Sequence, residues 1–100
     1  MVTQNNKQLI TLCSTICRSE NQISAAIDDE LVLMSVEKGN YYGLDAIGTD
    51  IWQRLEGPVM VADLCTALGK DYVADAETIR RDVLALLERL MAEGLIEIKS

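Results

Sequence analysis

Residues 37–55 read EKGNYYGLDAIGTDIWQRL and contain a tight turn, a short strand and the start of a helix. Gly39 and Asn40 favour the turn, because both tolerate the positive φ that a tight hairpin requires. Residues 41–44 have the composition of a strand, but one too short for the centre of a large sheet. Asp45 is a favourable N-cap, because its carboxylate can accept from the free N–H groups of the next turn. The stretch predicts a hairpin whose second strand lies at a sheet edge and runs directly into a helix.

Apolar residues recur at helical spacing in three later segments, at about 46–56, 61–68 and 76–93. Gly57-Pro58, Gly69 and Gly94 are expected to end these helices in turn. Asp75 is the expected N-cap of the third and longest helix.

The apolar residues of the first and third helices predict which faces are buried. One face of the first helix carries Ile47, Ile51, Trp52 and Leu55. The core stripe of the third helix consists of Ile79, Val83, Leu86, Leu87 and Leu90. Leu84 and Met91 make this stripe wider than a single core contact needs.

Two strands are expected before the hairpin, at residues 23–27 and 31–36, with an acidic turn at residues 28–29. Residues 31–36, LVLMSV, are apolar on both sides, which predicts burial of both faces. Together with residues 41–44 they predict a three-stranded antiparallel meander with the short strand last. Three helices after this meander predict a small α+β domain that is winged-helix-like.

The 100 residues, 49% of them hydrophobic, are enough for one domain with its own core. We expect this domain at residues 19–100, and residues 1–18 as an N-terminal segment that is partly ordered at most. Within that segment, residues 9–17 have enough β-character for an opening strand. Residues 95–98 are expected to form a last short strand or a packed tail.

The charge of the chain argues against nucleic acid as a partner. Its net charge is −7, and residues 19–100 contain all 16 acidic residues against seven basic ones. A nucleic-acid binder needs basic groups to neutralise phosphates, which this surface lacks. The third helix carries Arg80, Arg81 and Arg89, but four acidic residues accompany them. A winged-helix DNA-binding regulator therefore remains only as an alternative.

The residue types argue against an enzyme and against a bound metal or cofactor. The chain has no His, no glycine-rich phosphate loop and no recognisable nucleophile elbow. Cys13 and Cys17 lie four positions apart, but with only Cys65 beyond them a four-ligand zinc site would need carboxylates. We interpret the three cysteines as small hydrophobic residues, without a disulfide framework.

The sequence also predicts a cytoplasmic protein without a membrane segment. No apolar run approaches the roughly 20 residues that cross a bilayer. Residues 9–17 resemble a signal peptide only weakly, because Thr and Ser interrupt the run and no small-residue cleavage pattern follows.

An exposed edge at residues 41–44 could bind an extended peptide through main-chain hydrogen bonds. Alternate peptide side chains would then enter the space between this strand and the third helix. The apolar stripe of that helix offers Leu84 and Leu87 as a wall, with Val83 behind them and Arg80 at the rim. Ordinary core packing accounts for the same residues, so the pattern alone leaves both interpretations open.

Three motifs together resemble the PqqD-like family, the RiPP recognition elements. They are GNYYGLDAIGTDIWQRLEGP at 39–58, VADLCTAL at 61–68 and RRDVLALLERLMAEGLIEI at 80–98. The chain is most similar to the free-standing members from lasso-peptide biosynthesis, over about residues 23–98. It departs from the family at Met60, where a capping Thr is common, and this should weaken the start of the second helix.

The resemblance implies a non-catalytic protein that binds the leader segment of a ribosomally made precursor peptide as an added strand. It would deliver the precursor to a leader-cleaving cysteine protease and a macrolactam synthetase. The implied contacts to the peptide backbone are Asn40, Tyr41, Tyr42, Gly43 and Leu44. The implied side-chain pockets lie among Val32, Met34, Ile79, Val83, Leu84 and Leu87. A peptide chaperone of the pyrroloquinoline-quinone type, serving a radical enzyme, is the nearest alternative.

Overall fold

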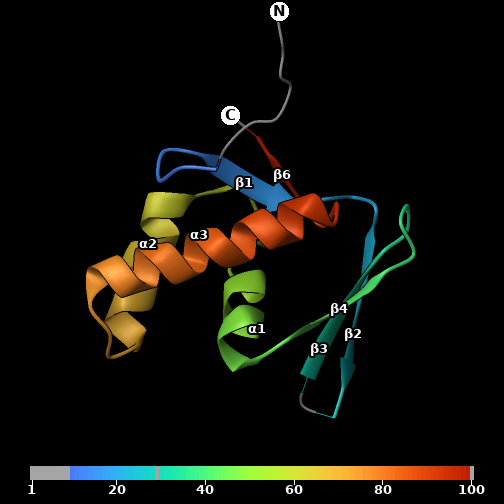
Figure 1. Ribbon diagram of the computed structural model, residues 1–100, viewed down its shortest axis with the longest axis horizontal. Helices are drawn as coiled ribbons and strands as arrows, with labels where there is room; N and C mark the ends of the chain where they lie inside the picture. Colours follow the sequence, from blue (N-terminus) through green and yellow to red (C-terminus); the bar gives the residue numbers. More distant parts are fainter. Residues whose placement is uncertain (1–9, 29, 100) are drawn as a thin grey trace, which may run out of the picture.

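The computed structural model describes residues 10–28 and 30–99, which form two three-stranded antiparallel sheets and three helices (Figure 1). One sheet has the order β2 (Gln22–Ile27), β3 (Glu30–Ser35) and β4 (Tyr41–Leu44). The helices are α1 (Ala46–Gln53), α2 (Val61–Asp71) and α3 (Ala76–Ala92). The predicted α+β class, with an antiparallel meander followed by three helices, is confirmed.

A second sheet, with the order β5-β1-β6, lies on the other side of the helices and was not predicted as a sheet. Its strands are β5 (Val59–Met60), β1 (Thr15–Arg18) and β6 (Ile96–Ile98). β1 is the central strand and pairs antiparallel with both neighbours. β5 has only two residues, too few to produce a recognisable period in the sequence.

Residues 10–18, in the segment that we expected to be partly ordered at most, contribute to the core. Ile16 of β1 is 0% exposed, and Ile10 is also buried in the core. Apolar side chains from the start of the chain therefore help to fill the same core as the helices. Residues 1–9 of the predicted N-terminal segment lie outside the described residues.

The meander buries one face and leaves the other largely open. Leu33 lies opposite Tyr42 and Leu31 opposite Leu44, so these four side chains share the inner face towards the helices. Leu33 and Leu44 are buried, whereas Val32 and Met34 point to the outer face and are only half-buried. The prediction that both faces of β3 are buried is therefore wrong, because the helices cover one face only.

The hairpin and the helix starts follow the predicted turn and capping chemistry. Gly39 has a φ of +71° in the β3–β4 turn. Asp45 accepts from the Gly48 N–H at 2.7 Å and Asp75 from the Thr78 N–H at 2.8 Å, which caps α1 and α3. Met60 is the N-cap residue of α2 and makes no side-chain capping hydrogen bond, as the sequence indicates.

Two predicted helix ends differ from the structure. α1 ends at Gln53, three residues early, because the chain turns there towards β5. α2 continues through Gly69 to Asp71. A glycine inside a helix costs about 1 kcal/mol, which packing of α2 against α3 can offset.

α1 is anchored by its tryptophan and by an arginine from β1. Trp52 is 2% exposed and belongs to the hydrophobic core. The Arg18 guanidinium donates to the Trp52 carbonyl at 2.6 Å and lies 4.7 Å from the centre of the indole ring. A charge-assisted hydrogen bond and a cation–π contact thus join β1 to the end of α1.

A second polar network joins α1 to the end of α2. Arg54 donates to Asp50 at 2.8 Å and also forms an ion pair with Asp71. The Tyr72 hydroxyl donates to Asp50 at 2.7 Å. These two hydrogen bonds lower the pKa of the Asp50 carboxyl, and the bond from Arg54 has the larger effect.

Arg18→Met should lower the free energy of unfolding by about 2 kcal/mol, because it removes both contacts to Trp52 while keeping an apolar stem. Urea unfolding measures this change. Arg81→Met is the matched control: the Arg81 side chain is 73% exposed, so its loss should change the free energy by less than about 0.5 kcal/mol. Equal effects of the two substitutions would contradict the anchoring role of Arg18.

Asp50→Asn should lower stability at neutral pH and reduce the acid dependence of stability. Because the folded-state pKa of Asp50 is lowered, its stabilising contribution is complete above about pH 4 and is lost as the pH falls through that lowered pKa. Urea midpoints measured across the acid range test this, and Tyr72→Phe should cause a smaller change of the same sign. If the urea midpoint of Asp50→Asn falls with decreasing pH as steeply as that of the parent protein, Asp50 does not contribute to the acid dependence of stability.

Candidate functional site

The outer edge of β4 is free within the described residues, as the sequence predicted. β4 pairs with β3 on one side, and no strand of residues 10–28 or 30–99 pairs with its other side. The Ser35 N–H donates to the Asn40 carbonyl at 3.2 Å, which makes this a hydrogen-bonded pair. Because such pairs alternate in antiparallel sheets, Tyr41 and Gly43 direct their N–H and C=O groups away from β3. Both residues can therefore bond to a further strand.

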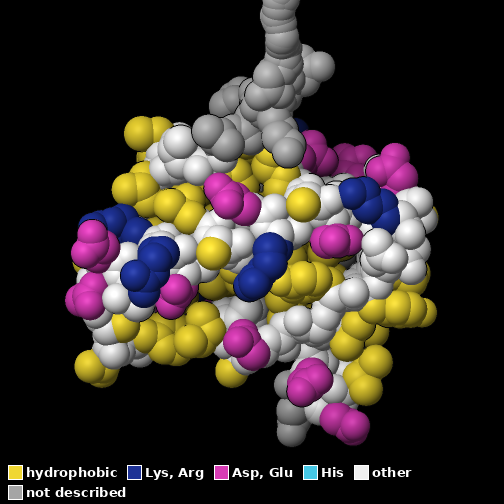
Figure 2. All heavy atoms as spheres, in the orientation of Figure 1, with side chains coloured by type: hydrophobic (Ala, Val, Ile, Leu, Met, Phe, Trp, Pro, Cys, Tyr) yellow, Lys and Arg dark blue, Asp and Glu magenta, His cyan; other side chains and the backbone are white. Residues whose placement is uncertain are grey.

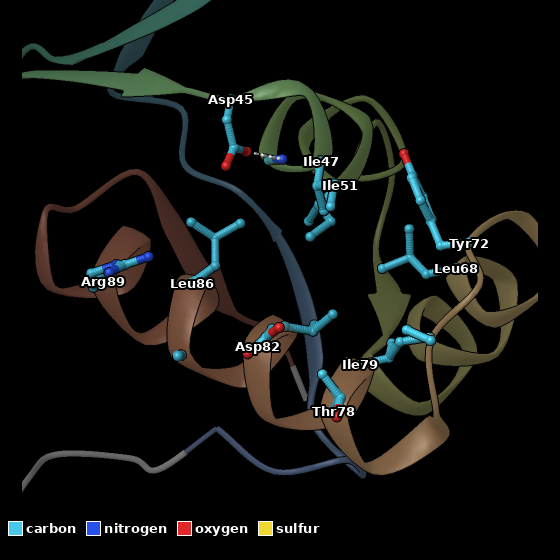
Figure 3. Close-up of a pocket in the computed structure, with 14 residues that line it drawn as sticks. Asp45, Ile47, Ile51, Leu68, Tyr72, Thr78, Ile79, Asp82, Leu86 and Arg89 are labelled. Carbon is cyan, nitrogen blue, oxygen red and sulfur yellow. Dashed lines mark hydrogen bonds between the residues drawn. The ribbon is translucent and has the colours of Figure 1, made fainter.

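A pocket of about 420 Å³ lies between α1 and α3, next to the end of β4 (Figure 3). Apolar side chains from α1, α2 and α3 form much of its lining: Ile47, Ile51, Leu68, Ile79, Val83 and Leu86. Figure 3 shows Leu86 projecting from α3 towards Asp45, and Ile47 projecting from α1 towards α3. Figure 2 shows hydrophobic side chains at the bottom of the hollow beside α3. The pocket thus begins at Asp45, directly after the last residue of β4.

A close approach of α1 to β4 sets one end of this site. A Cβ atom on Gly48 would lie 3.1 Å from the Asp45 carboxylate and 3.2 Å from the Leu44 side chain. Gly48 therefore allows the first turn of α1 to pack directly on the end of β4. This packing places Ile47, which is 50% exposed, at the mouth of the pocket.

The β3–β4 hairpin sets the other end by bonding to the last turn of α3. The Lys38 ammonium donates to the Ala92 carbonyl, and the Asn40 amide donates to the Glu93 carboxylate at 3.3 Å. A cation near the C-terminal end of a helix is favoured by the helix dipole. The free edge is therefore fixed to α1 at one end and to the last turn of α3 at the other.

The charged lining of the pocket is mixed, with Asp45, Asp82 and Arg89. Two carboxylates and one guanidinium do not form a site for a polyanion. Open backbone groups beside an apolar pocket instead suit an extended polypeptide with an apolar side chain.

The structure brings some of the predicted site residues together and separates others. Ile79 and Val83 line the pocket, whereas Leu84 and Leu87 do not, and Leu87 is 0% exposed. Arg80 lines a smaller hollow between α2 and α3, together with Cys65 and Gly69. Val32 and Met34 lie on the outer face of the sheet, opposite to the pocket side.

Sequence reasoning missed Ile47 and Leu86 because both fit the core stripes of their helices. Leu84 and Leu86 flank Val83 and Leu87 on opposite sides of α3, and each is half-buried. Which flank faces α1 depends on the direction of α3 across the domain. The helical periodicity of the sequence carries no information about the direction of α3 relative to α1. No sequence signal therefore distinguishes Leu84 from Leu86.

The described residues lack two other kinds of functional site. Within residues 10–28 and 30–99, no group of three or more His, Cys, Asp or Glu side chains could hold a metal ion. None of the helices there is long and apolar enough to cross a membrane. Cys13 is exposed, Cys17 is half-buried and Cys65 is buried. Desolvation by burial raises the pKa of the Cys65 thiol.

Two solved structures are similar to this chain. TbiB1 in complex with the TbiA(beta) leader peptide has 36% sequence identity and a TM-score of 0.75, over 84% of this chain and 98% of that chain. Lasso peptide synthetase B1 complexed with the leader peptide has 24% identity and a TM-score of 0.68, over 82% of this chain and 96% of that chain. At 24% identity, the second likeness shows the fold alone. No curated protein matches the chain.

The family comparison agrees with these structures. Residues 30–96, from β3 to the start of β6, match the model of the family described as Coenzyme PQQ synthesis protein D (PqqD). The match includes β4, all three helices and every residue that lines the pocket. The chain therefore belongs to the PqqD family.

Proposed function

We propose that this protein binds the leader segment of a ribosomally made precursor peptide by adding it as a strand to β4. The observation that carries the proposal is that Tyr41 and Gly43 direct their N–H and C=O groups away from β3, on a strand that ends at the apolar pocket. The leader peptide bound to TbiB1, a relative with 36% identity, supports it. In this role the protein is non-catalytic and delivers the precursor to a leader-cleaving cysteine protease and a macrolactam synthetase.

The proposed contacts divide between the peptide backbone and its side chains. The leader backbone bonds to Tyr41 and Gly43, within the predicted contact strand Asn40–Leu44. Every second leader side chain then shares the inner face with Tyr42, and one of them enters the pocket between Ile47 and Leu86.

This arrangement suits a disordered ligand. Ordering a flexible leader costs several kcal/mol, which main-chain hydrogen bonds and apolar burial must offset. Main-chain pairing accepts almost any extended sequence, and the pocket selects a leader with an apolar side chain at the right position. The two parts thus separate affinity from specificity.

Leu86→Gln should weaken leader binding by at least about tenfold, because it places an amide in the pocket in place of an apolar side chain. The measurement is a fluorescence-anisotropy titration with the labelled leader of the precursor encoded beside this gene. The parent protein should bind saturably, with a Kd of about 1 μM or below.

Leu84→Gln is the matched control, because Leu84 is also half-buried on α3 but does not line the pocket. Binding lost in Leu84→Gln and kept in Leu86→Gln would move the site to the flank expected from the sequence. Thermal unfolding verifies that both variants are folded. A folded parent protein that binds no leader but retards duplex DNA would replace the proposal with the DNA-binding alternative.

Strand addition predicts a period of two in the leader backbone. N-methylation of one leader residue at a time should block binding at alternate positions, those that pair with Tyr41 and Gly43. Methylation at the positions between them removes an N–H that points away from β4, so affinity should change little. Competition against the labelled leader measures each analogue. Uniform losses along the leader, or losses with a period of three to four, would contradict strand addition.

A further inference from the structure

Gly43 has no structural reason to be a glycine. A Cβ atom there would meet no described atom within 4 Å, and its φ lies outside the region that favours glycine. Glycine weakens a strand, because it loses more backbone entropy on folding and has no side chain to pack. A glycine in a strand often marks a place where a ligand or another backbone approaches closely. The fold would accept a larger residue at this position, so the open space above Gly43 requires another explanation.

The sheet register identifies what surrounds this space on the outer face. Val32 lies directly opposite Gly43 on one side and opposite Ala25 on its other side. Tyr41, two residues before Gly43, is 74% exposed on the same face. Small residues therefore flank Val32, and no described atom lies within 4 Å of the Cβ position of Gly43, between Val32 and Tyr41 on the outer face.

We propose that the leader residue paired with Gly43 carries a large apolar side chain, which packs over the glycine on the outer face. This inference rests on the proposed strand addition to β4. In the antiparallel addition that we propose, the leader residue that bonds to Gly43 lies directly opposite it and directs its side chain to the face of the Gly43 hydrogens. With no side chain on Gly43, an aromatic or long aliphatic group can reach Val32 and the Tyr41 ring.

The leader is therefore recognised on both faces of the extended sheet. One side chain enters the pocket between α1 and α3, and its neighbour in sequence covers Gly43 on the opposite face. This explains how Val32, an expected site residue that lies away from the pocket, contributes to binding. Met34 borders the same face opposite Tyr41. Two adjacent apolar residues in the leader are the chemical signature that this surface selects.

Gly43→Val tests the inference, because a structural role and a binding role predict opposite results. Valine favours a strand, and its Cβ would meet no described atom within 4 Å apart from its chain neighbours, so the variant should unfold at the same or a higher temperature. It occupies the space over position 43 that the leader side chain would take, so leader binding should weaken by at least about fivefold. Ala25→Val is the matched control, on the same face and across Val32 but away from β4, and should bind as the parent does.

A double-mutant analysis locates the leader residue involved. Alanine substitution of that residue should weaken binding to the parent protein by about fivefold and have little further effect in Gly43→Val. Parental affinity of Gly43→Val, or the same alanine profile in both proteins, would overturn the inference while strand addition stands. If the parent protein binds no leader, strand addition and this inference fail together.

Discussion

The position of α1 depends on the contact between Arg18 and Trp52, and the candidate site depends on α1. The guanidinium bonds to the Trp52 carbonyl and stacks on the indole, so the last turn of α1 is fixed to β1. The first turn is fixed to β4 through Gly48 and the Asp45 cap. A helix held at both ends forms a rigid wall of the site. Because this wall is already ordered, less conformational entropy is lost when a ligand binds.

The local elements and the strand edge could be predicted from the sequence, because each follows from chemistry within a few residues. Gly39 sets the hairpin turn, and Asp45 and Asp75 cap their helices by side-chain hydrogen bonds to the next turn. The short strand Tyr41–Leu44 was predicted at an edge, and the structure leaves its outer side free in the part of the chain that it describes. These features need no knowledge of distant contacts.

The second sheet and the flanks of α3 could not be predicted, because both depend on distant contacts. β5 is too short for a pattern, and its strand geometry comes from pairing with β1. Leu84 and Leu86 have the same helical environment, and only the packing of α1 distinguishes them. Periodicity identifies which residues can be buried, but it does not identify the partner that covers them.

The pairing of β1 with β6 joins the first and last described strands, and this constrains the order of folding. The meander β2–β3–β4 has local contacts and can form as soon as its own residues are available. β1 cannot complete its sheet until β6 has been synthesised, and until then Ile16 lacks one side of its packing. The pocket also needs α3, so the free edge of β4 can form before the pocket at its end is complete.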